Sequence, residues 1–256
     1  MPSRKEIAGR ALGLIDLTNL NEDCTEDAID ALCDQAATPF GPVAAICIWP
    51  RFVAQARARL GVGNAIRIAT VVNFPSGDAA VESVLEETRG AIADGADEID
   101  LVIPYKALAA GDEAALRAMV AAIRAETEGK ALLKVIVESG ELKDPALIST
   151  ASTVALEEGT DFIKTSTGKV AVNATPETAE IMLTALKAFG DEKRGFKPAG
   201  GIRTVAEAGD YLAIADRIMG EGWATAKTFR FGASSLLKDV LAALQGDGAV
   251  APGADY

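Results

Sequence analysis

The sequence contains no histidine, and this absence excludes more than any other feature of its composition. Ser-His-Asp and Cys-His catalysis both need an imidazole to accept the proton of the nucleophile. Histidine is also the ligand on which most catalytic zinc sites depend. Proton transfer in this protein must therefore use Asp, Glu, Lys, Tyr or thiol groups.

Cysteine and positive charge are also scarce. The three cysteines, Cys24, Cys33 and Cys47, form no C-x-x-C pair, so reduced thiols in the cytoplasm are expected. The 37 acidic and 25 basic side chains give a net charge of −12, which a nucleic acid or an anionic membrane would repel. No apolar run approaches the ~20 residues of a membrane helix, and Asp16 interrupts the apolar stretch that follows the basic start. We expect a cytoplasmic protein that binds neither nucleic acid nor membrane.

Hydrophobic residues make up 49% of the chain, enough for a folded core. Short apolar runs rich in β-branched residues alternate with longer Ala-rich segments of helical period. Successive runs start roughly 25 to 35 residues apart, the length of a strand and a crossover helix. The expected strands are Leu14–Thr18, Val43–Ile48, Arg67–Asn73, Glu98–Ile103, Leu132–Glu138, Asp161–Thr165, Gly195–Ala199 and Phe229–Gly232.

Eight strand–helix units without an internal linker predict one α/β domain over residues 1–256, folded as a (β/α)8 TIM barrel. Helix start signals, such as Asp144-Pro145 and a capping box at Thr204, lie between the expected strands. An extra helix at Arg4–Gly13 is expected to close the bottom of the barrel. The Gly/Ala/Pro-rich segment 246–256 is expected to be a mobile C-terminal tail. A doubly wound open sheet is the alternative, but no G-x-G-x-x-G follows the first strand.

Ionisable residues stand inside several of the apolar strands: Asp16, Asp100, Lys134, Lys164 and Lys197. Burying an unpaired charge is costly, so such residues are paired, neutralised or turned outward. A single lysine is readily explained by an outward-facing side chain whose ammonium group reaches solvent between helices. Three lysines in three successive strands at similar depth favour a shared interior site instead.

Lysines that converge at the mouth of a barrel disfavour one another's charge, and burial acts in the same direction. One of them can then be partly neutral near neutral pH, and a neutral amine attacks a carbonyl carbon to form a Schiff base. Asp100 supplies a matching carboxylate, and Glu138 at the end of the fifth strand is a second candidate. The residues alone leave open which lysine reacts.

Three loops near the end of the chain carry phosphate-binding features. They are Thr165–Lys169 (TSTGK), Gly200-Gly201 and Gly232–Ser235 (GASS). Barrels commonly bind phosphate on the loops after strands seven and eight, through backbone N–H groups and a helix N-terminus. Gly-Gly and Ser-Ser also mark ordinary turns and caps, so the expectation of a phosphorylated substrate depends on all three loops together.

With these residues the sequence resembles the deoxyribose-phosphate aldolase family, class I aldolases of (β/α)8 fold, in its longer bacterial form. The resemblance covers nearly the whole chain. Its most specific markers are DFIKTSTGKVAVNATP at 161–176, GFKPAGGIR at 195–203 and RFGASSLL at 230–237. It implies reversible cleavage of 2-deoxy-D-ribose 5-phosphate to D-glyceraldehyde 3-phosphate and acetaldehyde, without metal or organic cofactor. The implied partners are small phosphosugar and aldehyde substrates, and the family suggests a homodimer.

The resemblance also assigns roles to residues. Lys164 matches the Schiff-base lysine, Lys197 the neighbour that perturbs its pKa, and Asp100 the carboxylate that relays protons with Lys197 through water. Tyr256 matches a C-terminal tyrosine that assists proton transfer at the substrate methyl. The residues that match the family's substrate pocket are Asp16, Thr18, Cys47 and Lys134, and those at its phosphate end are Thr167, Lys169, Gly200, Gly201, Ile202, Arg203, Gly232, Ser234 and Ser235.

Two other functions remain open: a Schiff-base aldolase for another phosphosugar, and a catalytically silent barrel that binds phosphosugars. The joint presence of the markers around Lys164 and Lys197 argues against the first, and the intact lysines with Asp100 argue against the second. Cys47 lies between Ile46 and Ile48, where a thiol is more often a small core side chain than a catalyst; we expect it to line the pocket.

Overall fold

The computed structural model describes residues 2–246, and its centre is a sheet of eight parallel strands. The strands lie in the order β10-β1-β4-β5-β6-β7-β8-β9, so strands that follow one another in the chain are neighbours in the sheet. All eight expected strands are confirmed. Their bounds are β1 (Ile15–Asn19), β4 (Ala45–Ile48), β5 (Arg67–Val72), β6 (Glu98–Val102), β7 (Leu132–Ile136), β8 (Phe162–Lys164), β9 (Gly195–Lys197) and β10 (Phe231–Ala233).

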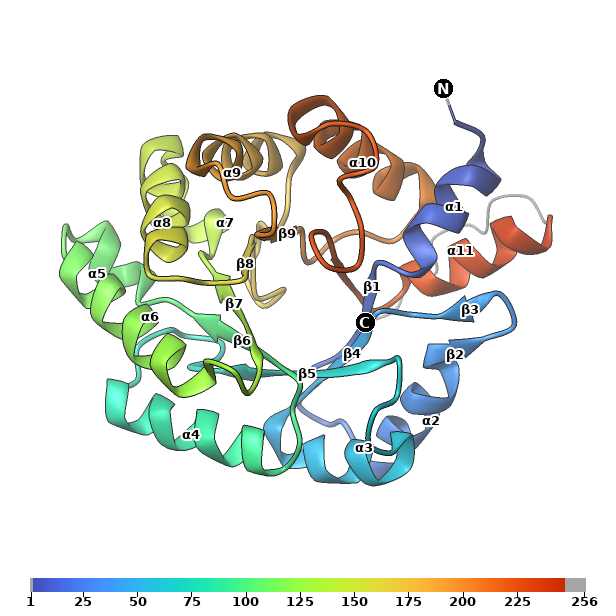
Figure 1. Ribbon diagram of the computed structural model, residues 1–256, viewed down its shortest axis with the longest axis horizontal. Helices are drawn as coiled ribbons and strands as arrows, with labels where there is room; N and C mark the ends of the chain where they lie inside the picture. The colour runs from blue at the N-terminus through green and yellow to red at the C-terminus, as the bar shows by residue number, and fades with distance from the viewer. Residues whose placement is uncertain (1, 247–256) are drawn as a thin grey trace.

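The sheet closes between the segments that contain β9 and β10. Isolated parallel bridges join Phe196 to Phe229 and Ala199 to Gly232. The backbone N–H of Gly232 also donates a hydrogen bond to the carbonyl oxygen of Pro198, at 2.9 Å. Figure 1 shows the resulting barrel with helices around it. The expected (β/α)8 barrel is confirmed, and the alternative of an open doubly wound sheet is wrong.

Helices cover the outside of the barrel, which is why the strands are apolar almost throughout. Every residue of β4 is buried, for example. The expected start signals are confirmed: the Asp144 side chain accepts from the N–H of Ala146, and Thr204 and Glu207 form a reciprocal capping box. The helices are α1 (Arg4–Leu12), α2 (Glu26–Ala36), α3 (Val53–Leu60), α4 (Val81–Ala93), α5 (Tyr105–Ala109), α6 (Glu113–Thr127), α7 (Ser139–Leu142), α8 (Pro145–Glu157), α9 (Pro176–Phe189), α10 (Val205–Met219) and α11 (Leu236–Gln245), with a 3-10 turn at Pro50–Phe52.

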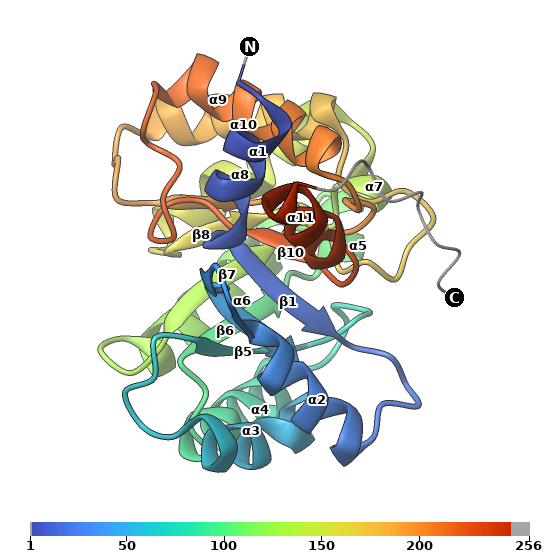
Figure 2. The ribbon, with the colours of Figure 1, turned by 90° about the vertical axis from the view of Figure 1, so that its right-hand side faces the viewer.

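Helix α1 forms as expected but lies elsewhere. It packs beside α10 and α11 (Figure 2), and Arg10 forms an ion pair with Asp216 of α10 at 2.7 Å. Its buried side chains are Ala8, Ala11 and Leu12, and the two alanines allow close packing in the outer ring of helices. The expectation that this helix closes the bottom of the barrel is therefore wrong. The first residues of β5, β6 and β7 instead line a cavity of about 850 Å³ at that end.

Further features lie outside the strand–helix repeat. A short antiparallel hairpin, β2 (Ala37–Thr38) with β3 (Gly41–Pro42), was not expected from the sequence. Within residues 2–246, no helix combines the length and the apolar character needed to span a membrane. The expected tail lies outside the described residues apart from Gly246, and so does Tyr256.

Candidate active site

Strand register brings the charged residues of the strands together inside the barrel. Lys164 of β8 pairs with Lys197 of β9, and Asp100 of β6 pairs with Lys134 of β7. Paired residues in neighbouring strands point to the same face of the sheet, and all four side chains are buried. The lysines therefore do not turn outward between the helices, and the shared interior site is confirmed.

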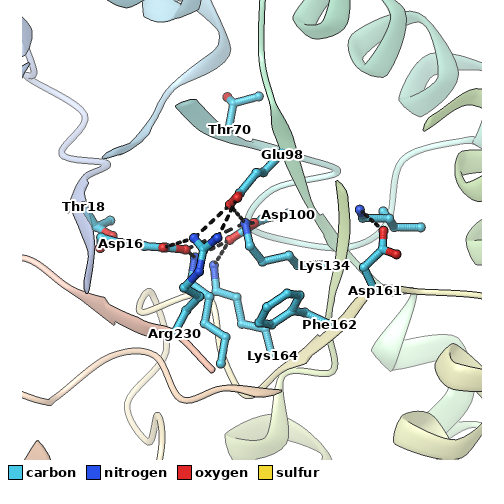
Figure 3. Close-up of polar contacts among 12 residues, drawn as sticks. Asp16, Thr18, Thr70, Glu98, Asp100, Lys134, Asp161, Phe162, Lys164 and Arg230 are labelled. Carbon is cyan, nitrogen blue, oxygen red and sulfur yellow. Dashed lines mark hydrogen bonds and ion pairs between the residues drawn. The ribbon is translucent and has the colours of Figure 1, made fainter. Parts of the chain in front are cut away.

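The carboxylate of Asp100 is the centre of this site. Its Oδ1 lies 2.8 Å from Nζ of Lys134, and its Oδ2 lies 2.7 Å from Nζ of Lys164 and 2.8 Å from Nζ of Lys197. Lys197 also contacts Oδ2 of Asp16 at 2.6 Å. Figure 3 shows Asp100 with Lys134, Lys164 and Asp16, whose side chains converge from different strands. Two lysines thus share a single oxygen atom of Asp100.

Two residues that the sequence analysis missed complete the site from below. Glu98 precedes Asp100 by two positions on β6, so both side chains point into the barrel, and its Oε2 lies 2.6 Å from Nζ of Lys134. Arg230, just before β10, contacts Glu98 at 2.9 Å and Asp16 at 2.7 Å. The alternation rule for strands could have found Glu98, since Asp100 was already assigned to the interior.

The charges explain why one lysine differs from the others. Four basic groups meet three carboxylates here: Lys134, Lys164, Lys197 and Arg230 against Asp16, Glu98 and Asp100. If every group were ionised, the fully buried cluster would carry an excess positive charge, which burial penalises. A neutral amine on one lysine removes this excess.

The balance of burial and charge distinguishes Lys164 from the other two lysines. Burial, with the positive charge of Lys197 in addition, outweighs the attraction of Asp100 and lowers the pKa of Lys164. Burial acts on Lys197 as well, but Asp100 and Asp16 outweigh it, so the pKa of Lys197 lies above its ordinary value. Asp100 and Glu98 likewise raise the pKa of Lys134 against the effect of burial. Of the three lysines, Lys164 therefore loses its proton most readily.

Lys164 is also the member of the cluster that reaches the pocket above it. This pocket, of about 330 Å³, lies at the carboxyl ends of β1, β8, β9 and β10. Among residues 2–246, its lining includes three basic residues, Lys164, Lys169 and Arg203, and no acidic residue. In a chain of net charge −12, such a local excess of positive charge favours an anionic ligand.

The pocket wall has the features of a phosphate site. Helix α11 begins at Leu236 next to the pocket, and no side chain of the described part of the chain caps its first turn, so its N–H groups suit an anion. Gly200 has φ +84°, a conformation that L side chains rarely adopt, and a Cβ there would lie 2.7 Å from Asn173. At Gly232 a Cβ would lie 2.7 Å from that of Ala199. Glycine at both positions therefore lets the pocket wall pack closely against Asn173 and Ala199.

The expected site residues fall into two layers. The upper layer, which lines the pocket, contains Thr18, Lys164, Thr167, Lys169, Gly200, Gly201, Ile202, Arg203, Gly232, Ser234 and Ser235. It also contains residues that were not expected there, namely Leu20, Asn21, Gly168, Asn173, Ala199 and Ala233. The lower layer contains Asp100 and Lys197, together with Asp16, Cys47 and Lys134, all fully buried. The last three were expected in the pocket lining but lie beneath it.

Cys47 packs as a small core residue. It clusters with Leu20, Ala69 and Val71, and burial raises the pKa of its thiol. The other two cysteines are also free thiols, Cys33 buried and Cys24 partly exposed. This environment favours the thiol over the reactive thiolate.

Glu138, the second candidate carboxylate, forms its hydrogen bonds with the loop after β8, and its charge also interacts with that of Lys164. It is fully buried in a left-handed conformation, with φ 52°. Its two carboxylate oxygens accept from the backbone N–H of Thr167 at 3.3 and 3.2 Å, and burial raises its pKa. On the same loop, the ammonium of Lys169 donates to the carbonyl oxygen of Leu20 at 2.7 Å. These contacts hold the loop after β8 against the rest of the pocket.

Comparisons with known proteins agree with this geometry. The model of the DeoC/LacD family aldolases matches residues 10–242. The deoxyribose-phosphate aldolase of Agrobacterium fabrum (strain C58) is 61% identical over 242 residues, which cover 94% of this chain and 93% of that protein. A solved structure from Toxoplasma gondii ME49, assigned as a deoxyribose-phosphate aldolase, has a TM-score of 0.87 at 28% identity and covers 96% of this chain and 99% of its own. The tetrameric deoxyribose phosphate aldolase of Aeropyrum pernix has a TM-score of 0.74 at 26% identity, over 94% and 92% of the two chains.

Proposed function

The chain belongs to the DeoC/LacD family of aldolases, and we propose that it is a class I aldolase for 2-deoxy-D-ribose 5-phosphate. It would cleave this sugar reversibly to D-glyceraldehyde 3-phosphate and acetaldehyde. The observation that carries the proposal is the position of Lys164, a buried lysine of lowered pKa at the floor of a positively charged pocket. A neutral amine at such a place is suited to form an imine with a phosphorylated aldehyde.

The proposed reaction begins when the neutral amine of Lys164 attacks C1 of the open-chain sugar. Loss of water from the carbinolamine then gives a protonated imine. Asp100 Oδ2, at 2.7 Å from Lys164 and 2.8 Å from Lys197, is placed to accept and return the protons of this step. Lys197, which holds its own proton more tightly, remains the cation of the pair.

The imine next serves as the electron sink for bond cleavage. The C3 hydroxyl loses its proton, the C2–C3 bond breaks, and its electron pair moves into the imine to give an enamine. Glyceraldehyde 3-phosphate leaves. Protonation of the enamine at C2 creates the methyl group, and water then releases acetaldehyde and the free amine of Lys164. Tyr256 is our candidate for assisting the protonation at C2; it lies outside the described residues.

The phosphate would bind at the opposite end of the pocket, on the loops around Lys169, Gly200 and Ser234 and at the start of α11. Binding energy from this remote group helps to hold C1 near the amine, and it is lost when the phosphate is absent. This arrangement predicts that the dephosphorylated sugar reacts far more slowly than the phosphate ester.

A substrate panel tests the proposal. Release of the three-carbon product is measured with 2-deoxyribose 5-phosphate, ribose 5-phosphate and a fructose phosphate. The same assay is applied to Lys164→Met and to a control variant, Lys187→Met, on the exposed face of α9. We expect the highest kcat/KM with deoxyribose phosphate and no activity in the Lys164 variant. Faster cleavage of another phosphosugar would favour the alternative aldolase, and binding without any cleavage would favour the silent barrel.

We further propose that residues 1–256 act as one catalytic domain and that the chain forms a homo-oligomer. The tetramer described for the Aeropyrum pernix protein supports self-association in this fold. The finer expectations, a homodimer and a cytoplasmic location, stay predictions; the molar mass in solution tests the first.

A further inference from the structure

Glu98 and Arg230 form an ion pair in the layer beneath the reacting lysine. Nη2 of Arg230 lies 2.9 Å from Oε1 of Glu98, and Nη1 lies 3.2 Å from Oε2, so the pair is bidentate. Glu98 is fully buried and Arg230 is 4% exposed. Neither residue lines the pocket above, so neither is placed to touch a substrate there.

The pair completes a closed ring of alternating charge. From Arg230 the ring runs to Asp16 at 2.7 Å, then to Lys197 at 2.6 Å and to Asp100 at 2.8 Å. It returns from Asp100 to Lys134 at 2.8 Å, to Glu98 at 2.6 Å and back to Arg230. The ring holds three basic and three acidic groups, and each group contacts at least two of opposite charge; Lys134 also lies 3.7 Å from Asp16 across the ring.

Lys164 is the basic group that this ring leaves out. It contacts the ring at one atom, Oδ2 of Asp100, which Lys197 also occupies. When all six ring members are ionised the ring is neutral, so a proton on Lys164 adds a positive charge that the ring itself does not balance. Closure of the ring therefore decides which lysine is free to react.

The surroundings of Arg230 fix its guanidinium in this role. Nε of Arg230 donates to the carbonyl oxygen of Ala226 at 2.6 Å, and its Cζ lies 5.7 Å from the centre of the Phe162 ring. Phe162 occupies the space where a side chain at Gly195 would stand, since a Cβ there would lie 2.3 Å from the phenyl ring. The guanidinium is thus held by hydrogen bonds, two carboxylates and an aromatic face at once.

We propose that Glu98 and Arg230 are positioning residues for the aldolase reaction, which close the charge-balanced ring and thereby make Lys164 the lysine that forms the imine. This role rests on the proposed function and extends it to two residues outside the pocket. The residues act only through their neighbours: Arg230 through Asp16, and Glu98 through Lys134.

The ring makes opposite predictions for its two members. Arg230→Gln removes a positive charge, so a proton on Lys164 restores the balance. The acid limb of the pH–rate profile, where imine formation slows because Lys164 becomes protonated, then moves to higher pH. Glu98→Gln removes a negative charge and moves the limb to lower pH. The double variant removes one charge of each sign and returns the limb towards that of the wild type. Each single shift is expected to be about one pH unit, or tenfold in rate on the limb.

Other charges near Lys164 must stay unchanged for this comparison. Those that act on it are Asp100 from β6, Lys197 from β9 and the thiol of Cys47 from β4. Glu138, at the end of β7, also interacts with Lys164, and Lys134 and Asp16 reach it through Asp100 and Lys197. The proposed substitutions alter none of these side chains.

The experiment measures the rate of imine trapping by borohydride with acetaldehyde as the probe, as a function of pH. It compares the wild type with Arg230→Gln, Glu98→Gln, the double variant and Arg230→Lys, each normalised to its folded fraction. The matched control is the exposed ion pair Arg217–Glu180, at 3.0 Å, with the same glutamine substitutions. We expect opposite shifts in the single variants, a restored limb in the double variant and in Arg230→Lys, and no shift in the control pair.

The outcomes separate this proposal from the proposed function. A wild type that forms no imine refutes the aldolase itself, whatever the variants do. If the wild type reacts, shifts of the same sign, or lower rates without a shift of the limb, assign Glu98 and Arg230 to a purely structural role and overturn the proposal. If a single variant fails to fold, the double variant and Arg230→Lys decide. An acid limb at the same pH as in the wild type supports the proposal, and a displaced acid limb contradicts it.

Discussion

Replacement of Lys197 by methionine tests how the cluster keeps Lys164 neutral. Lys197 and Lys164 contact the same oxygen of Asp100, at 2.8 and 2.7 Å. Without Lys197, Asp100 Oδ2 is free to pair with Lys164 alone, and three basic groups remain against three carboxylates. The proton of Lys164 then balances the cluster, and we expect its pKa to rise.

The size of the effect follows from the fraction of free amine. The ordinary pKa of a lysine amine is 10.5, at which only about one amine in 10³ is unprotonated at a pH of about 7.5. Each unit of increase in pKa costs tenfold in free amine, equivalent to about 1.4 kcal/mol. A return of the Lys164 pKa to this ordinary value would cost up to about 10³-fold in free amine. We expect imine formation near neutral pH to slow by about ten- to 10³-fold.

The assay is the pH dependence of imine trapping with acetaldehyde, compared with Lys187→Met on the exposed face of α9. The reasoning predicts that the rate of the Lys197 variant recovers as the pH is raised, because free amine returns. A folded variant with an unchanged acid limb, or with a loss that does not recover at high pH, would refute it.

Three further predictions concern other residues. Burial would raise the pKa of Asp16, but Lys197 and Arg230 outweigh it and hold the pKa below its ordinary value. The resulting stability is therefore present above about pH 4 and lost as the pH falls through the folded-state pKa. Asp16→Asn should lower the free energy of unfolding in urea by about 3–5 kcal/mol at neutral pH. A loss of the same size in acid would contradict this. Cys47→Ala should keep near-normal turnover and lose about 1 kcal/mol of stability, whereas a collapse of turnover in a folded variant would give the thiol a catalytic part. Deletion of Tyr256 should slow proton exchange at the methyl group of acetaldehyde more than it weakens substrate binding, and unchanged exchange would remove the tail from the mechanism.

The strand positions and the buried lysines could be predicted from the sequence because each leaves a visible pattern. The eight strands are apolar runs at regular spacing, and charges within such runs are rare enough to indicate a site. Asp100, Lys134, Lys164 and Lys197 were found in this way. Which lysine reacts could not be decided from the strands, because the answer depends on the sharing of Asp100 Oδ2 between two ammonium groups.

The rest depends on contacts that no local pattern encodes. Glu98 and Arg230 stand at strand ends, where charges normally face solvent, and they meet because the barrel closes between β9 and β10. Cys47 was expected in the pocket wall, but the depth of a residue along a strand is set by the register of its neighbours. The position of helix α1 could not be predicted from local sequence. Its partners, α10 and α11, lie some 200 residues away in the chain.

The central claim, that Lys164 is the imine-forming lysine, is tested most directly by chemical trapping. The protein is reduced with borohydride in the presence of acetaldehyde, and the modified peptide is identified by mass spectrometry. We predict an ethyl group on Lys164, the lysine that contacts both Asp100 and the pocket. Modification of Lys197 or Lys134, or an active and folded protein in which no lysine is trapped, would contradict the account.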